Sequence, residues 1–361
     1  MLAGHGSHRL AARRLPVTRA LSLLLSLLLA LLAQGGPLQG QLPGGAAPGA
    51  GAPACTGRNV LDELARTDAA AYARILAAAE ATENGGAILW RIERAGIEPS
   101  HLLGTMHLSD ARIAALPAAA AAALHSARRL VLEIADLEAG GLADAFQKAR
   151  ELMMLAGGRR LDHMLGEEEF RKLAEVLQRL GMRSQAVAMF RPWVPSLLLA
   201  LSDCERLRVA RGELPLDLRL ARAAKERGIA VAGLETVELQ LRAMAQVPEA
   251  DQVEILKAGL RNYDRIDDLI ETTVQLYLGR RLGAVWPLQL ALAEKVGVAA
   301  RAFDSAEHNL LVARNLRMRD KALPHLADGG VMIAVGALHL PGRHGLVALL
   351  RAAGYEVTAV E

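Results

Sequence analysis

The sequence predicts an α/β protein with a central mixed sheet, flanking helices and a large helical insertion. Short apolar runs of strand length alternate with longer helical patterns, as they do in a sheet covered by helices. Two of these runs end in the tetrapeptide Gly-x-x-His, once at Gly104 and His107 and again at Gly336 and His339. Because ligands bind at the carboxyl ends of strands in open α/β sheets, both histidines are expected to face one pocket.

The first 54 residues are predicted to lie outside the folded domain, which is assigned to residues 55–361. Arginines precede an apolar run over residues 20–33. This order is typical of an export signal, residues 1–33, cleaved near Ala33, or alternatively of an uncleaved membrane anchor. Residues 34–54 are rich in Gly, Pro and Ala and are expected to form a disordered linker. The protein is therefore expected to be periplasmic or secreted, or held at the inner membrane only through this first segment.

The charge balance argues against nucleic-acid binding, and the cysteine content predicts a disulfide. The chain has 42 Lys and Arg against 39 Asp and Glu, and four of the arginines lie in the first 54 residues. The folded part lacks the clustered basic stripe of a nucleic-acid-binding surface, so no nucleic-acid partner is expected. The two cysteines, Cys55 and Cys204, lie in the exported part and are interpreted as one disulfide. Cys55 also follows small residues as in a lipoprotein signal, which is the alternative for that cysteine.

The elements of the first half follow from their periodicity and turn residues. They are predicted, in order, as a helical segment over residues 58–82, a turn at 84–86, a strand over 87–93, a turn over 95–100, the hairpin partner over 101–106, a helix from 109 or 110 to 127 and a strand over 129–135.

Glu133 is predicted to stand inside the strand over residues 129–135, between Leu132 and Ile134. A carboxylate there is costly unless it meets a cation or a metal, so Glu133 is a candidate metal ligand or base. The alternative is a glutamate at an exposed edge or paired with an arginine. Glu235 ends the apolar run over residues 228–235 in a similar position.

Residues 140–226 have no strand pattern of useful length and are predicted as a helical insertion that covers the end of the sheet. Three consecutive acids, Glu167 to Glu169, resemble a metal cluster, but the macrodipole favours acids in the first turn of a helix. The rest is predicted as helices over residues 253–282 and 285–319 with polar interruptions at 307–309 and 314–315, a strand over 331–335, a helix over 344–353 and a strand over 355–360.

The chemistry that remains is histidine and carboxylate at strand ends. The sequence has no His-Glu-x-x-His, Gly-x-Ser-x-Gly, phosphate-binding loop or Rossmann glycine motif. Two imidazoles and one or two carboxylates are the usual ligands of a catalytic divalent metal, which lowers the pKa of a bound water and polarises a carbonyl. Without a metal, the same groups would act as a His and Glu acid–base pair.

The chain resembles the TraB/GumN family in an ordered series of short motifs. These are Leu103-Gly-Thr-Met-His-Leu108, Val131-Leu-Glu133, Leu216-Asp217, Gly233-Leu-Glu-Thr236 with Gln240, Arg314-Asn315, and Val335-Gly-Ala-Leu-His-Leu-Pro-Gly342 followed by Gly345 and Gly354-Tyr355. The family is related to the Tiki proteases, which act on Wnt proteins. The resemblance implies an α/β fold similar to the erythromycin-esterase and ChaN-like proteins, with a metal-dependent site.

Carried over to this sequence, the resemblance places three residues at the centre of the site and three nearby. His107, Glu133 and His339 would bind a divalent metal (Mn, Co, Fe or Zn), and Glu133 would be a ligand or the base. The residues nearby are Glu235, an alternative base, Arg314, which would stabilise an oxyanion or hold a substrate carboxylate, and Asn315.

The function implied is that of an exported metal-dependent hydrolase, a peptidase with a peptide or protein substrate. The alternative is a non-catalytic binding protein of the cell envelope that captures a peptide or glycan through its helical insertion. Similar exported members of the family also have a cysteine near the mature start and a Cys-Glu pair before the Leu-Asp run. This similarity supports the pairing of Cys55 with Cys204.

Overall fold

The computed structural model describes residues 57–135 and 147–360. The predicted export signal, the linker and Cys55 lie outside the described residues. None of the helices in the described ranges is long and apolar enough to cross a membrane.

The predicted α/β fold is confirmed, with a mixed sheet of six strands in the order β4-β3-β5-β2-β1-β6. The first four strands in this order are parallel, whereas β1 is antiparallel to both of its neighbours. Each strand corresponds to one predicted from the sequence. The bounds are β1 (Leu89–Arg94), β2 (Ile97–Thr105), β3 (Arg129–Leu132), β4 (Ala230–Gly233), β5 (Val331–Gly336) and β6 (Glu356–Ala359).

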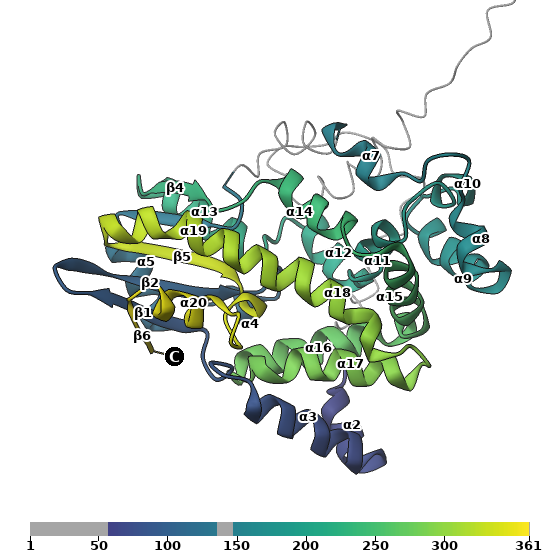
Figure 1. Cartoon of the computed structure of the whole chain (residues 1–361), viewed down its shortest axis with the longest axis horizontal. Helices are drawn as coiled ribbons and strands as arrows, with labels where there is room; N and C mark the ends of the chain where they lie inside the picture. Colours follow the sequence, from purple (N-terminus) through teal and green to yellow (C-terminus); the bar gives the residue numbers. More distant parts are fainter. Residues whose placement is uncertain (1–56, 136–146, 361) are drawn as a thin grey trace, which may run out of the picture.

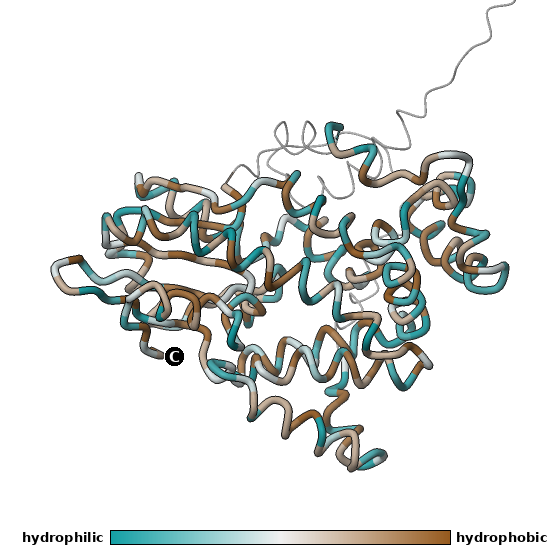
Figure 2. The backbone as a smooth tube through the Cα atoms, viewed as in Figure 1, coloured by the Kyte–Doolittle hydropathy of each residue, from teal (hydrophilic) through white to brown (hydrophobic). Residues whose placement is uncertain are grey.

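Helices cover both faces of the sheet. Val131, Ile333 and Val335 point toward α19 and α20, which lie in front of the sheet in Figure 1. Their neighbours Leu130 and Leu132 pack on the opposite face against α5, α13 and α16. β5 is buried on both faces, so its sequence is continuously apolar, as Figure 2 shows. The bounds are α5 (Ala118–Ser126), α13 (Leu216–Glu226), α16 (Ile266–Leu278), α19 (Ala313–Asp328) and α20 (Leu346–Ala352).

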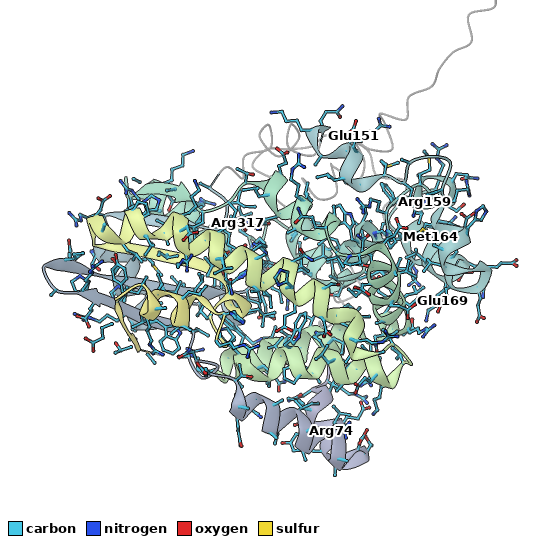
Figure 3. The ribbon with its side chains drawn as sticks, in the orientation of Figure 1. Arg74, Glu151, Arg159, Met164, Glu169 and Arg317 are labelled. Carbon is cyan, nitrogen blue, oxygen red and sulfur yellow. The ribbon has the colours of Figure 1, made fainter. Side chains whose placement is uncertain are left out.

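A second hydrophobic core lies among the helices beyond the sheet edge, around Phe190 and Trp193. Glu169, labelled on this part in Figure 3, belongs to the first turn of α9 with Glu167 and Glu168, as the macrodipole interpretation predicted. The helices of this part are α7 (Arg150–Met153), α8 (Leu161–Leu165), α9 (Glu167–Gln178), α10 (Ser184–Val187), α11 (Trp193–Leu199), α12 (Asp203–Ala210), α14 (Val237–Ala245) and α15 (Glu249–Arg261).

The first predicted helix is two helices, because Asp68 ends one and caps the next by accepting a hydrogen bond from the N–H of Ala71 at 3.0 Å. Both pack against α17. The remaining elements are α2 (Val60–Thr67), α3 (Ala69–Ala81), α4 (Ala111–Ala114), η1 (Tyr263–Arg265), η2 (Leu282–Ala284), α17 (Val285–Lys295), η3 (Ala300–Phe303), α18 (Asp304–Glu307), η4 (His308–Val312) and η5 (Ala337–His339).

Three local predictions are corrected. The hairpin turn is shorter than expected, because β2 already begins at Ile97 after Gly96, whose φ of +79° suits glycine. Glu133 directly follows β3 instead of standing inside it. Arg314 and Asn315 are not a polar interruption: both are buried in the first turn of α19, and the irregular segment is the π-helical η4 just before them.

Candidate functional site

The carboxyl ends of three parallel strands meet at one edge of the sheet. β5 lies between β2 and β3, and the register places the last residues of β2 and β5, Thr105 and Gly336, side by side. His107, Glu133 and His339 each follow one of these strand ends within three residues. The structure therefore brings the three predicted central residues together, in the crevice position of an open α/β sheet.

His107 contacts the carboxylate of Asp217, which lies at the start of α13. Asp217, in the first turn of α13, accepts a hydrogen bond from the Thr105 hydroxyl at 2.7 Å and lies 2.7 Å from His107 Nδ1. The charge of Asp217 raises the pKa of His107 to about 9, against the opposing effect of removal from water. Because 62% of the His107 side chain remains exposed, solvent screens much of this attraction.

Glu133 is buried and surrounded by hydrogen-bond donors. Its Oε2 accepts from Arg314 Nη2 at 2.7 Å and from Gln240 Nε2 at 2.9 Å, and its Oε1 accepts from the N–H of Gly336 at 2.5 Å. Burial favours the neutral acid, but the charges of His107 and Arg314 and the hydrogen bond from the N–H of Gly336 outweigh it and lower the pKa of Glu133 to about 2. Glu133 is therefore an ionised carboxylate at neutral pH.

His339 has a defined tautomer. Asn315 donates from Nδ2 to the carbonyl of His344 at 2.8 Å, so its Oδ1, 2.6 Å from His339 Nδ1, is the acceptor. The imidazole proton is thus assigned to Nδ1, and the lone pair of Nε2 lies 3.6 Å from Glu133 Oε1. Burial lowers the pKa of His339 to about 4, which keeps the ring neutral.

Arg314 joins the two predicted carboxylates. Its Nε donates to Glu235 Oε2 at 2.8 Å, and its Nη2 donates to Glu133. The side chain of Glu235 is fully buried, and its second oxygen lies 3.6 Å from Nη2 of Arg317, which Figure 3 labels on α19. Glu235 contacts Arg314 and Arg317, and its link to Glu133 runs through the guanidinium of Arg314.

Gly336 leaves room at the point where the three central side chains converge. A Cβ atom there would lie 3.0 Å from Glu133 Oε1, 3.4 Å from His107 Nε2 and 3.6 Å from His339 Cδ2. In the first motif, a Cβ on Gly104 would lie 3.0 Å from the backbone of Ala337. The glycines of the two motifs therefore let the two strand ends approach each other and keep the space between the histidines open.

The two imidazoles and the carboxylate of Glu133 are ligand types that suit a divalent cation, but their side chains are not arranged in the geometry of a metal site. Each histidine has its Nδ1 engaged by an oxygen, as metal-binding imidazoles usually do. Nε2 of His339 carries a lone pair, whereas His107, with a pKa of about 9, is protonated at neutral pH and must lose a proton to bind a cation. Across residues 57–135 and 147–360, however, no three His, Cys, Asp or Glu side chains stand in an arrangement that would hold a metal ion.

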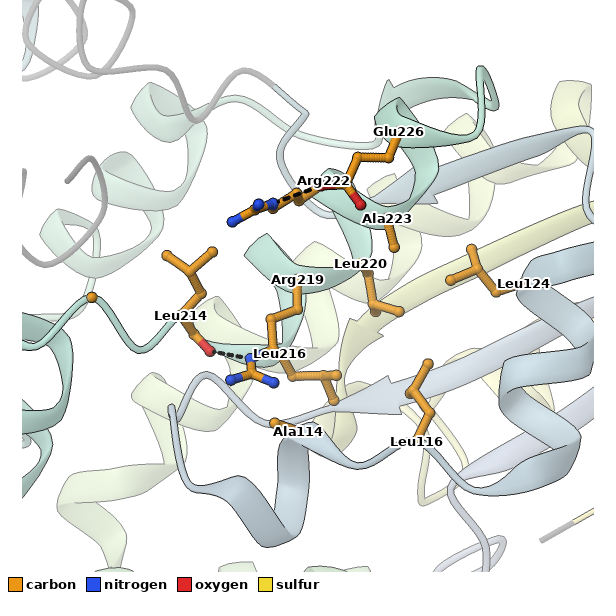
Figure 4. A pocket seen from close by; sticks show the side chains of 11 residues that line it. Ala114, Leu116, Leu124, Leu214, Leu216, Arg219, Leu220, Arg222, Ala223 and Glu226 are labelled. Atoms are coloured by element: carbon orange, nitrogen blue, oxygen red, sulfur yellow. Dashed lines mark hydrogen bonds and ion pairs between the residues drawn. The ribbon is translucent and has the colours of Figure 1, made fainter. Parts of the chain in front are cut away.

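A cavity of about 370 Å³ lies between α13 and the segment over residues 114–124 (Figure 4). Leu116, Leu124 and Leu220 line it, and two arginines at its rim are engaged nearby: Arg219 donates to the Leu214 carbonyl at 3.0 Å and Arg222 to Glu226 at 2.8 Å. None of the predicted site residues lines this cavity.

Comparison with known proteins agrees with the motifs at the strand ends. Residues 88–359 match the TraB/PrgY/gumN family. The chain belongs to the TraB/PrgY/gumN family. Two relatives, from Shigella flexneri and Escherichia coli (strain K12), are each named uncharacterized protein YbaP and are 26% identical to this chain. The alignments cover 71% and 70% of this chain and 89% and 87% of the relatives. No solved structure matches the chain.

Two residues of this TraB/PrgY/gumN chain complete the site without a role having been predicted for them. Asp217 orients His107, and Gln240 donates to Glu133. Both belong to the motifs that carry the family resemblance, and Asp217 lies at a helix start that Pro215 marks in the sequence. Only the fold shows which strand end each of them contacts.

Proposed function

We propose that the chain is an exported metal-dependent hydrolase that cleaves peptide bonds at the edge formed by β2, β3 and β5. The observation that carries the proposal is the convergence of His107, His339 and Glu133 around Gly336, with Nδ1 of the two imidazoles held by Asp217 and Asn315. A peptide or protein is the substrate class implied by the relation of the family to peptidases.

His107 and His339 would hold the cation through Nε2, and Glu133 would supply a carboxylate oxygen. A bound Mn, Co, Fe or Zn ion supplies a more acidic water and polarises a substrate carbonyl. With a pKa near 2, Glu133 suits a ligand better than a general base, because an efficient base has a pKa near the working pH.

Arg314 would supply positive charge to the site. Its guanidinium would stabilise a developing oxyanion or hold a substrate carboxylate, as donors fixed in advance do in other hydrolases. Glu235 holds it by the 2.8 Å contact to Nε, and its full burial fits this supporting role better than that of a base.

Export is part of the proposal. The predicted signal over residues 1–33 would deliver the chain to the periplasm or beyond, where a disulfide between Cys55 and Cys204 is stable. In the described residues no cysteine is free, and Cys204 lies in the first turn of α12. Thiol labelling of periplasmic protein before and after reduction tests the pair: both cysteines should react only after reductant is added.

A second candidate is a metal-independent hydrolase that uses His107 as the general acid, because a pKa of about 9 keeps the ring protonated at neutral pH. The 2.7 Å contact from Asp217 to Nδ1 favours it, because a carboxylate–imidazole pair of this kind orients the catalytic imidazole in many hydrolases. In this version Glu133 and Arg314 bind the substrate.

Elemental analysis of chelator-free protein separates these alternatives. The test compares the wild type with a His107→Ala, His339→Ala double variant and with His125→Ala, an exposed histidine on α5 that serves as control. The proposal predicts near-stoichiometric metal and metal-dependent peptide cleavage in the wild type and the control, and neither in the double variant. Cleavage without metal would support His107 as the general acid. Absence of both would leave an envelope binding protein and overturn the hydrolase.

A further inference from the structure

A buried carboxylate outside the site holds the segment that carries His107. Glu205 lies on α12, is 2% exposed, and accepts a hydrogen bond at Oε1 from the backbone N–H of Ser109 at 2.6 Å. Ser109 is fully buried and lies two residues after His107. A hydrogen bond to an ionised carboxylate is shorter and stronger than a neutral one, so this contact is a firm anchor for the segment.

Ion pairs also link the residue after Ser109, Asp110, to α12 and α16. Arg208, on the same helix as Glu205, lies 3.1 Å from Asp110 Oδ2 and 3.6 Å from the second oxygen of Glu205. Asp110 also accepts from Arg112 Nε at 3.0 Å, and Arg112 Nη1 donates to Glu271 on α16 at 2.9 Å. The hydrogen bond from Arg112 lowers the pKa of Asp110 to about 2, so Asp110 stays charged.

The backbone around His107 is therefore fixed at both ends. On one side, Thr105 belongs to β2 and bonds to Asp217. On the other side, Ser109 is held by Glu205 on α12. Only three residues lie between these two anchors, so a shift of Ser109 must move the imidazole relative to Gly336. α12 thus contacts this segment through two side chains, Glu205 at Ser109 and Arg208 at Asp110.

We propose that Glu205 is a positioning residue for His107, through which α12 sets the direction of His107 Nε2 toward Gly336 and its neighbours. The inference deepens the proposed function and rests on His107 acting in that site. Its test reads the position of the segment directly, so it gives an answer whether or not the hydrolase activity is found.

The experiment compares Glu205→Ala and Glu205→Gln with the wild type by NMR. Loss of the acceptor in Glu205→Ala should accelerate exchange of the Ser109 amide, by roughly 10-fold or more if the bond has the usual strength of one to a charged group. It should also move the His107 ring signals. Glu205→Gln keeps an oxygen acceptor at this position, although a neutral one. The Ser109 amide in this variant should therefore exchange at a rate between those of the wild type and Glu205→Ala, and the His107 signals should lie closer to those of the wild type.

Val209→Ala is the matched control, because Val209 is a buried residue of the same helix that has no part in this anchor. It should lower the stability while leaving the Ser109 exchange and the His107 signals as they are in the wild type. The proposal is overturned if Glu205→Ala loses stability like the control with unmoved His107 signals. If Glu205→Ala does not fold, Glu205→Gln decides: wild-type exchange at Ser109 in that variant rejects the proposal.

Discussion

One guanidinium bridges two buried carboxylates in this fold: Nη2 of Arg314 lies 2.7 Å from Glu133 Oε2 and 2.8 Å from Glu235 Oε2. All three side chains are almost fully buried, and they come from α19 and from the ends of β3 and β4. The attraction within such a group offsets the cost of taking its charges out of water only while the group is complete. Arg314 therefore supports the fold and the site together.

Replacing Arg314 with alanine should be strongly destabilising, because two buried carboxylates lose their partner. We expect the free energy of unfolding to fall by about 3–5 kcal/mol, measured by urea denaturation. Arg317→Ala is the control, since the Arg317 side chain is 41% exposed and its contact with Glu235 is longer, at 3.6 Å. In this variant the free energy of unfolding should fall by less than about 1 kcal/mol. Similar losses in both variants would mean that the buried cluster is not electrostatically coupled.

Asp217→Asn should change the titration of His107. The folded protein holds the pKa of His107 at about 9 instead of 6.5, so the Asp217 pair stabilises the fold fully below pH 6.5 and loses this contribution as the pH rises through 9. In the variant, the pKa measured by NMR should fall toward 6.5. The stability difference between variant and wild type should shrink between pH 6.5 and 9. A difference that does not change with pH over this range contradicts the pairing, and Asp264→Asn, an exposed acid, serves as control.

The sheet could be predicted from the sequence because each strand is a short apolar run with turn residues at its ends. The run from Val331 to Val335 is buried on both faces and has no alternation, which identifies a central parallel strand. The two Gly-x-x-His motifs likewise predicted that both histidines lie at the same end of the sheet, since a motif that follows a parallel strand must lie at its carboxyl end.

The contacts within the site could not be predicted, because they join segments far apart in the chain. Asp217 lies 110 residues from His107, and Arg314 lies 181 residues from Glu133. The sequence around Arg314 and Asn315 resembled a polar interruption. A π-helical turn directly precedes these two buried residues, and no periodicity of 3.6 residues reveals such a turn.

Gly336→Ala should abolish metal binding and activity while lowering the stability of the fold only moderately. The backbone of Gly336 is accessible to any residue, with φ of −51°, but the new methyl group would meet Glu133 Oε1 at 3.0 Å and His107 Nε2 at 3.4 Å. Such overpacking costs about 1–3 kcal/mol. We expect this loss in thermal unfolding together with loss of metal binding and activity.

Gly259→Ala is the matched control for that substitution. Gly259 lies inside α15, and a Cβ there would meet nothing within 4 Å. Alanine should therefore stabilise the helix by about 0.5–1 kcal/mol and leave the site unchanged. If Gly336→Ala behaves like this control, the space between the histidines is not needed for binding.

Asn315→Leu should allow His339 to adopt both of its neutral tautomers. Asn315 fixes the imidazole because its own amide is oriented by the carbonyl of His344, and leucine removes both contacts at once. Leaving a buried donor unpaired costs about 1–3 kcal/mol, and the His339 ring should become a mixture of its two neutral forms in nitrogen NMR spectra. Asn262→Leu, which also loses hydrogen bonds to backbone carbonyls, should lower stability without this spectral change. A single unchanged tautomer in Asn315→Leu would show that burial alone, and not Asn315, keeps Nε2 of His339 unprotonated.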